Sequence, residues 1–98
     1  MNDDNWTLYS MIKNGIYEHE VSEIISGYKE CCSKKEREEK SRLSELNYKG
    51  SLYDNTGFSY HKYTLTIHIN PQFPHWLLNT LIRCYEDVCM DVYNKRST

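Results

Sequence analysis

The chain has 98 residues, of which 39% are hydrophobic and 27% charged, and its formal net charge is −2. That length predicts one domain with a modest core, and 14 acidic against 12 basic residues give no electrostatic argument for binding nucleic acid. The opening segment, MNDDN, lacks the basic and apolar runs of a signal peptide, and no stretch approaches the roughly 18 apolar residues of a membrane span. We therefore expect a cytoplasmic protein with no membrane association and with reduced cysteines.

Two helices are predicted in the first half of the chain. A short helix begins after Asn5, carries apolar residues through Ile12, and ends at Asn14-Gly15, because glycine favours the left-handed conformation that closes a helix. A long helix begins near Tyr17. Its apolar residues recur at spacings of three and four, at Val21, Ile24, Ile25 and Tyr28.

The segment 33–42 contains no apolar residue. Glu36 and Lys40 stand four residues apart in the order that supports a helix, and so do Glu38 and Arg42. We interpret the segment as a charged extension of the long helix, exposed along its whole length, with a charged loop as the alternative. Replacing its charges should then leave stability nearly unchanged.

A β-hairpin is predicted next, with strands over 47–53 and 58–70 and a turn at 54–57, which is rich in residues that tolerate positive φ. Alternation in the second strand places one set of residues on a common, apolar face: His61, Tyr63, Leu65, Ile67 and Ile69. A four-residue loop adds Tyr48, Gly50 and Leu52 to that face, whereas a three-residue loop would mix the two faces. The pattern therefore favours the longer loop.

A final helix is expected over about 74–93, because its apolar residues again repeat at three and four. A two-stranded sheet is marginal alone, so the helices should cover its apolar face. The predicted architecture is a single α+β domain: short helix, long helix with a charged extension, two-stranded antiparallel hairpin, and a C-terminal helix packed on the hairpin.

Four cysteines and four histidines in so short a chain make zinc a candidate cofactor. The spacing fits no zinc motif, because Cys84 and Cys89 would point about 140° apart on a helix. Strand register nevertheless places His61 on the apolar face, and the return of the last helix places Cys89 at a similar level. With Cys31 or Cys32 these residues would form a ligand set, Cys84 being the reserve. The alternative, which we favour, is that the thiols are small buried hydrophobic groups.

Catalysis and DNA binding have little support in the sequence. A His61–Cys89 dyad can be drawn, but no oxyanion-hole motif, glycine-rich phosphate loop or paired-carboxylate pattern accompanies it. The two opening helices have the layout of a helix-turn-helix, yet the second carries Glu18, Glu20 and Glu23, which DNA phosphates repel. A plain helical hairpin is the better interpretation, and a nucleic-acid-binding regulator built on it remains an alternative.

The polar side of the predicted hairpin carries three aromatic residues, Tyr53, Phe58 and Tyr60, beside Lys49 and Lys62. Exposed aromatic residues flanked by cations are typical anchors of a protein interface. The alternative is that the first helix covers them. The sequence thus predicts a protein-binding module that is not an enzyme.

In its size, its high tyrosine and asparagine content and its lack of catalytic motifs, the chain resembles the phage-encoded inhibitors of bacterial defence, including the anti-CRISPR proteins that block Cas9. These features of type, rather than a motif, carry the resemblance. It implies steric inhibition of a nuclease–RNA complex in the bacterial host cell. The near-neutral charge argues against DNA mimicry. An immunity or antitoxin protein is a further alternative.

Overall fold

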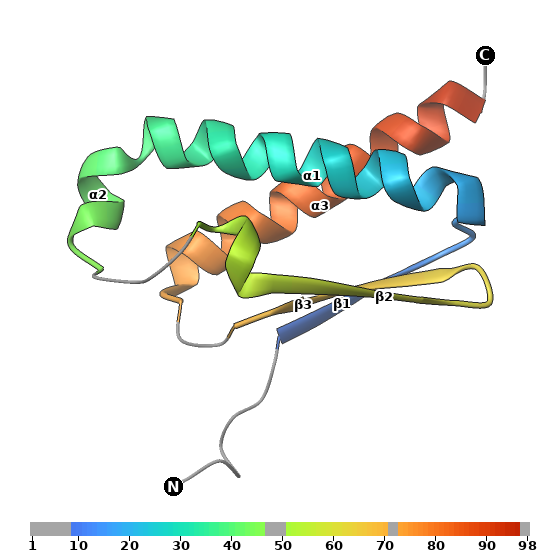
Figure 1. The fold of residues 1–98 in the computed structure, drawn as a ribbon, viewed down its shortest axis with the longest axis horizontal. Coiled ribbons are helices and arrows are strands. Elements are labelled where there is room, and N and C mark those ends of the chain that lie inside the picture. The colour runs from blue at the N-terminus through green and yellow to red at the C-terminus, as the bar shows by residue number, and fades with distance from the viewer. Residues whose placement is uncertain (1–8, 47–50, 71–72, 97–98) are drawn as a thin grey trace, which may run out of the picture.

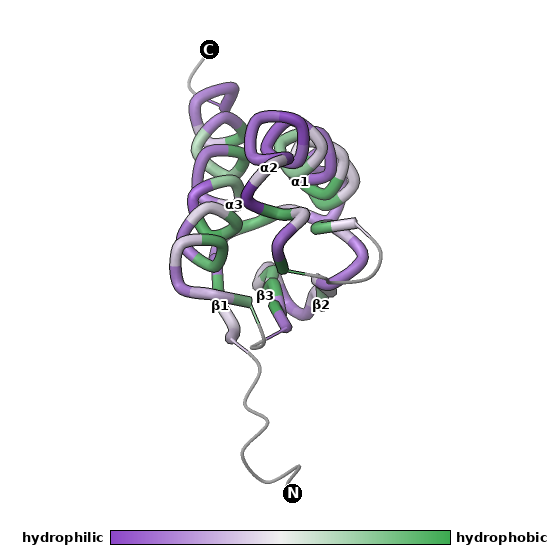
Figure 2. Tube along the Cα trace, turned by 90° about the vertical axis from the view of Figure 1, so that its left-hand side faces the viewer, coloured by the Kyte–Doolittle hydropathy of each residue, from purple (hydrophilic) through white to green (hydrophobic). Residues whose placement is uncertain are grey.

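The computed structural model describes residues 9–46, 51–70 and 73–96. Its elements are, in chain order, β1 (Tyr9–Asn14), α1 (Glu18–Glu38), α2 (Lys40–Ser44), the 3₁₀ turn η2 (Tyr53–Asn55), β2 (Thr56–His61), β3 (Thr64–Ile69) and α3 (His75–Arg96). The strands form an antiparallel sheet in the order β1-β3-β2, and α1 and α3 lie over one of its faces (Figure 1). Figure 2 shows hydrophobic stretches of the trace on the helices and on the sheet, bordering the space between them. The predicted α+β fold is confirmed, with three strands in place of two.

The predicted first helix is wrong, because residues 9–14 form strand β1. This strand pairs with β3 from Tyr9 opposite Ile69 to Asn14 opposite Thr64. Its half-buried residues alternate with exposed ones, as a strand at the edge of a sheet requires. Gly15, at φ +76°, then turns the chain into α1. Residues 5–8 lie outside the described residues, but the helical hairpin and the helix-turn-helix both need a helix at 9–14, and neither forms.

The hairpin turn is also misplaced in the sequence prediction. It consists of Lys62 and Tyr63, at φ 48° and 66°, and positive φ at both central residues is the two-residue turn that suits twisted strands. The predicted strand over 58–70 is therefore two strands, β2 and β3. The segment 54–57 is instead the end of η2 and the start of β2. Of the predicted first strand, residues 51–53 are not in a strand, and residues 47–50, including Tyr48 and Gly50, lie outside the described residues.

The corrected turn changes which residues face the core. Leu65, Ile67 and Ile69 are fully buried, as predicted. Tyr63 is 61% exposed, because it belongs to the turn, and His61 is exposed on the sheet face that the helices leave open. Leu52 is buried as expected, although from a turn rather than from a strand.

The long helix and the C-terminal helix are confirmed. α1 buries Ile24, Tyr28 and Cys32, and it continues into the charged segment as far as Glu38. The predicted extension to Arg42 is interrupted at Glu39, and the rest of the segment belongs to the separate helix α2. α3 packs on the sheet, where the Tyr85 hydroxyl donates a hydrogen bond of 2.7 Å to the Leu65 carbonyl oxygen. No helix in the described part of the chain has both the length and the apolar character needed to cross a bilayer.

α1 and α3 also pack closely against each other. A Cβ on Gly27 would lie 3.0 Å from Val88 Cγ1, so the glycine permits this approach. A disulfide between Cys31 and Cys84, whose Cα atoms are 5.9 Å apart, links the two helices. The expectation of reduced cysteines is therefore wrong for this pair. That expectation was based on the predicted cellular compartment, and the compartment does not determine which side chains the fold brings together.

The charged segment is not exposed along its whole length. Glu36 accepts a hydrogen bond of 2.5 Å from the Leu52 backbone N–H, which ties α1 to the chain just before η2. The Arg42 guanidinium lies 3.7 Å from the centroid of the Trp76 ring at the start of α3. Long charged side chains reach back over the core in this way, which an absence of apolar residues does not reveal.

We expect Glu36→Ala to lower the free energy of unfolding by about 1–3 kcal/mol, because the part-buried Leu52 N–H would lose its acceptor. Glu36→Gln keeps an acceptor oxygen and should recover most of that loss. Lys40→Ala, at an exposed position, is the control and should change stability by less than about 0.5 kcal/mol. Urea unfolding of the three variants measures this. Equal stability of the Glu36→Ala and Lys40→Ala proteins would mean that the hydrogen bond does not stabilise the fold.

Candidate protein-binding site

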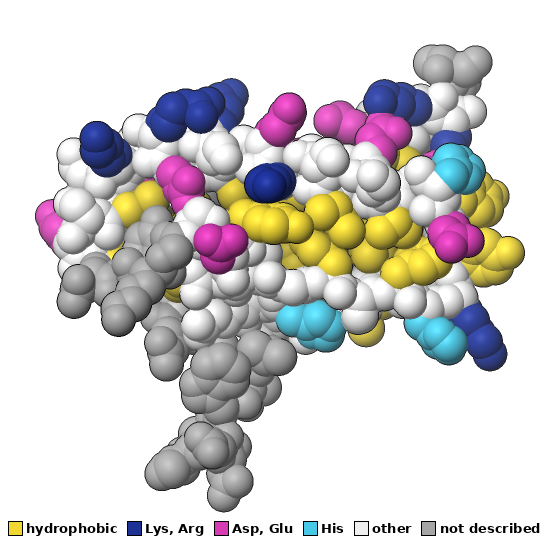
Figure 3. Space-filling model, viewed as in Figure 1, with side chains coloured by type: hydrophobic (Ala, Val, Ile, Leu, Met, Phe, Trp, Pro, Cys, Tyr) yellow, Lys and Arg dark blue, Asp and Glu magenta, His cyan; other side chains and the backbone are white. Residues whose placement is uncertain are grey.

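A band of apolar side chains lies between α1 and β2. Figure 3 shows hydrophobic side chains gathered across the middle of this face. The band consists of five half-buried residues, which we call the α1–β2 strip: Val21, Ile25, Tyr53, Phe58 and Tyr60. Beside it is a groove of about 510 Å³, lined by Val21, Ile25 and Tyr60 together with Glu18, Ser22 and Ser26.

The strip follows from where each element places its side chains. On α1, Val21 and Ile25 each stand three residues before a core residue, Ile24 and Tyr28, so they border the buried stripe without entering it. On β2, Phe58 and Tyr60 are paired with buried residues of β3 and therefore face the helices. β2 is an edge strand, so these rings are covered on one side only.

Contacts with the core hold the aromatic rings of the strip in place. The Phe58 ring meets the Tyr28 ring edge-on at a centroid distance of 5.3 Å, and Tyr53 lies 6.3 Å from the same ring. The Tyr60 hydroxyl donates a hydrogen bond of 2.6 Å to the Ile16 carbonyl oxygen. Rings fixed before binding lose little conformational freedom when a partner covers them.

Three of the five predicted partner-binding residues are brought together in this strip: Tyr53, Phe58 and Tyr60. They face the helices and not the polar face of the sheet, so the predicted side is wrong. Lys62 is exposed in the hairpin turn, away from the strip, and Lys49 lies outside the described residues. The sequence pattern assigned Val21 and Ile25 to the core. The signal that could have separated them is their position at the margin of the helical stripe.

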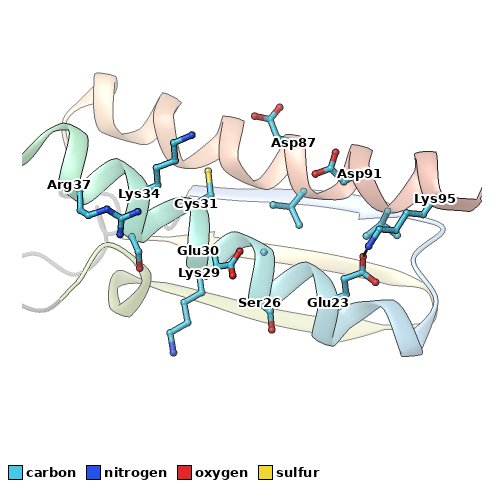
Figure 4. Close-up of a pocket in the computed structure, with 14 residues that line it drawn as sticks. Glu23, Ser26, Lys29, Glu30, Cys31, Lys34, Arg37, Asp87, Asp91 and Lys95 are labelled. Atoms are coloured by element: carbon cyan, nitrogen blue, oxygen red, sulfur yellow. Dashed lines mark hydrogen bonds and ion pairs between the residues drawn. The ribbon is translucent and has the colours of Figure 1, made fainter.

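Charged side chains lie at both ends of the strip. Glu18, at the start of α1, lines the groove near the hairpin turn. At the other end, Lys29 Nζ lies 5.5 Å from the centroid of the Tyr53 ring. In Figure 4 the Lys29 side chain extends away from α3. A partner that covers the strip therefore meets Glu18 at one end. At the other end it meets Lys29, beside the Asp54 and Glu36 carboxylates, which accept hydrogen bonds from the Ser51 and Leu52 backbone N–H groups.

The predicted zinc ligands are not brought together. Cys31 is joined to Cys84, Cys32 and Cys89 are free and buried, and His61 is exposed. The sheet separates His61 from the Cys89 thiol, so the predicted His–Cys dyad does not form. Over residues 9–46, 51–70 and 73–96, no group of three or more His, Cys, Asp or Glu side chains could hold a metal ion. The described residues therefore offer zinc no ligand set.

The two free thiols are also poor nucleophiles. Burial raises the pKa of Cys32 to about 12, and burial raises that of Cys89 to about 11. A thiol with such a pKa stays protonated near neutral pH, whereas the thiolate is the reactive form. Both residues act as small hydrophobic groups, the interpretation that the sequence favoured.

Two other surfaces are chemically distinct from the strip. The groove between α1 and α3, of about 1240 Å³, has a rim of mixed charge that includes Lys34, Asp87 and the Glu23–Lys95 ion pair (Figure 4). On the open sheet face, the His68 ring nitrogens each lie 3.0 Å from a serine hydroxyl, Ser10 on β1 and Ser59 on β2. These bonds fix the imidazole across three strands. Neither surface presents a comparable apolar band beside a free strand edge.

Comparisons of the chain with known protein families, with curated proteins and with solved structures found no match.

Proposed function

We propose that this protein is a non-enzymatic binding module that attaches to a partner protein through the α1–β2 strip. The observation that carries this proposal is the strip itself, in which three fixed aromatic rings and two aliphatic side chains are half-exposed beside an edge strand. Aromatic residues at well-packed positions contribute most of the binding energy in protein interfaces. The charged ends of the strip supply the polar rim that such interfaces have.

We further propose that binding is itself the activity, so that the protein inhibits its partner by covering a surface. The resemblance to inhibitors of bacterial defence supports this mode of action. A nuclease–RNA complex such as that of Cas9 remains the predicted partner, and the bacterial cytoplasm the predicted location. The immunity or antitoxin alternative uses the same mode of action on a different target, so identification of the partner separates the two.

Capture experiments test the proposed function. The full chain is immobilised and exposed to a bacterial lysate and, separately, to a purified Cas9–guide RNA complex. We expect Ile25→Glu to weaken capture of the partner by about 30-fold, because a charge in the apolar strip must be desolvated on binding. The matched control is Met90→Glu, at a position on α3 that is 56% exposed, and it should bind as the unaltered protein does.

Thermal unfolding of both variants shows whether they are folded. Capture that is equally strong with Ile25→Glu and with Met90→Glu would place the binding surface elsewhere and overturn the assignment of the strip. Capture of a toxin enzyme, with the same dependence on Ile25, would support the immunity alternative.

A further inference from the structure

We infer that the partner contributes an extended segment that pairs with β2 as a fourth, antiparallel strand and inserts alternate apolar side chains under α1. This inference rests on the proposed function and specifies how the strip recognises its partner. Addition of a strand to an exposed sheet edge is a common mode of peptide recognition, in which backbone hydrogen bonds give affinity and side-chain sites give specificity.

The register of β2 shows which backbone groups are available. A two-residue turn makes His61 and Thr64 a hydrogen-bonded pair, and the antiparallel pattern then alternates along the strand. The same alternation makes Asn55 and Asn70 a hydrogen-bonded pair. The Asn70 N–H indeed donates a hydrogen bond of 3.1 Å to the Asn55 carbonyl oxygen. Phe58 and Tyr60 are therefore the residues whose N–H and C=O groups point away from β3, toward the open edge.

The Thr56 N–H also points toward the open edge, but it donates a hydrogen bond to the Tyr53 carbonyl oxygen and is not available to an added strand. The edge thus offers two complete pairs of donor and acceptor, at Phe58 and Tyr60, and the Thr56 carbonyl. In antiparallel pairing each complete pair exchanges two hydrogen bonds with a single residue of the added strand.

The two edges of the sheet differ in their protection. Edge strands usually carry charges or proline, which discourage pairing with other chains. β1 contains Lys13, and its Asn14 carbonyl oxygen accepts a hydrogen bond of 3.0 Å from the Tyr93 hydroxyl of α3. β2 has neither a charged residue nor a proline from Thr56 to Tyr60. β2 is therefore the edge that is suited to accept a strand.

An added strand would also place side chains in the groove beside the strip. Residues directly opposite each other in an antiparallel pair point to the same side of the sheet. The segment residues opposite Phe58 and Tyr60 would then point toward α1, as those two residues do. An added strand lies about 4.8 Å from β2, which places these side chains against Val21 and Ile25 in the groove.

The charges at the ends of the strip specify the sequence of the segment. An antiparallel strand runs from the hairpin turn toward Tyr53, so its first residues lie near Glu18 and its last ones near Lys29. The complementary segment has a basic residue first, then apolar residues at alternate positions, and an acidic residue last.

Amide hydrogen exchange tests this inference directly. The probe is the peptide acetyl-Arg-Thr-Val-Thr-Val-Thr-Glu-amide, in which Arg, both Val and Glu share one face of the strand, added to the full chain labelled with ¹⁵N. We expect exchange at the Phe58 and Tyr60 amides to slow by about tenfold or more at saturation. The amides of Gly57 and Ser59, which already bond to β3, should change little. A peptide with Arg and Glu exchanged should bind about threefold or more weakly at low salt.

Each other result of this experiment contradicts the inference. If Phe58 and Tyr60 exchange at unchanged rates at millimolar peptide, no strand is added. If the chain alone protects these amides and doubles its mass as its concentration rises, the occupant of the edge is a second copy of the chain. If a partner whose capture depends on Ile25 leaves the Phe58 and Tyr60 amides unprotected, the inference of strand pairing is contradicted and the proposed function stands. If capture does not depend on Ile25, the proposed function itself is contradicted.

Discussion

Reduction of the Cys31–Cys84 disulfide is expected to lower the free energy of unfolding by about 4 kcal/mol. The two cysteines are separated by 53 positions in the sequence. In the chain-entropy account, a cross-link closing a loop of that length removes about 4 kcal/mol of conformational freedom from the unfolded chain at 25 °C. The measurement is urea unfolding with and without dithiothreitol, with thiol counting to confirm that one disulfide has been opened.

The control is the double variant Cys31→Ala with Cys84→Ala. Its unfolding curve should not respond to dithiothreitol, because Cys32 and Cys89 are free in the folded chain. Its stability should lie near that of the reduced protein, lowered somewhat further by truncation of the buried Cys84 side chain. Identical curves for the oxidised and reduced unaltered protein would show that the link between α1 and α3 adds nothing to the packing around Gly27.

The same experiment bears on the predicted location. In a reducing cytoplasm the pair would be two thiols, so the stability measured in reductant is the relevant value there. α1 carries two residues of the strip, and the disulfide fastens α1 to α3 one helical turn beyond Tyr28. Opening the disulfide would therefore loosen the helix that forms one wall of the groove.

The long amphipathic helices could be predicted from the sequence, and the strands only in part. α1 repeats apolar residues over about three turns, from Val21 to Cys32, and α3 repeats them over nearly five, so chance agreement with a helical period is small. β1 has six residues, and over so short a run a helical and an alternating pattern are hard to distinguish. Pairing with β3, a long-range contact, determines its conformation.

The hairpin turn was mislocated because the residues that form it are not typical of turns. Lys62 and Tyr63 adopt positive φ, although the sequence places a stronger turn signal at Asp54-Asn55-Thr56-Gly57. Alternation continues through 62–63 when the sequence is read as one strand. Moving the turn reversed the orientation of His61, and with it the basis of the predicted metal site.

The candidate binding site could be predicted in its residue types but not in its setting. Tyr53, Phe58 and Tyr60 are large aromatic residues close together in the sequence, which suffices to suggest an interface. Their place beneath α1 depends on the strand order β1-β3-β2, which leaves β2 at an edge. Strand order is a property of the whole sheet, and the pattern of one strand does not contain it.

Arg96→Ala is expected to lower the free energy of unfolding by roughly 2–3 kcal/mol at pH 7. Glu20, only 6% exposed, accepts hydrogen bonds from the Arg96 guanidinium and from the Tyr17 backbone N–H. Arg96 also donates a hydrogen bond of 2.6 Å to the Gly15 carbonyl oxygen. Removal of one partner leaves a buried carboxylate incompletely compensated, which is the costly case for an ion pair.

The pH dependence of the free energy of unfolding tests whether Arg96 stabilises ionised Glu20. The hydrogen bonds from Arg96, helped by the Tyr17 N–H and opposed by burial, lower the pKa of Glu20 from 4.5 to about 2. The pKa of Glu20 is lower in the folded protein than in the unfolded chain. The contribution of ionised Glu20 to the free energy of unfolding is therefore fully present above about pH 5, and it is lost as pH falls toward 2. Glu20→Gln should therefore flatten the stability curve between pH 5 and 2, and Arg96→Ala should reduce its slope there.

Lys95→Ala is the matched control for Arg96→Ala. Lys95 neighbours Arg96 on α3 and pairs with Glu23, but the two side chains are 69% and 47% exposed. An ion pair so exposed contributes at most about 1 kcal/mol, and salt screens it further. Urea unfolding at pH 7 and at pH 3 should thus separate the two variants. At pH 7 only Arg96→Ala is strongly destabilised. At pH 3 the difference in stability between them shrinks, because Glu20 of the Arg96→Ala protein takes up a proton. Equal losses from both substitutions at both pH values would mean that Glu20 is not held by Arg96, and that Arg96 contributes no more than the exposed Glu23–Lys95 pair.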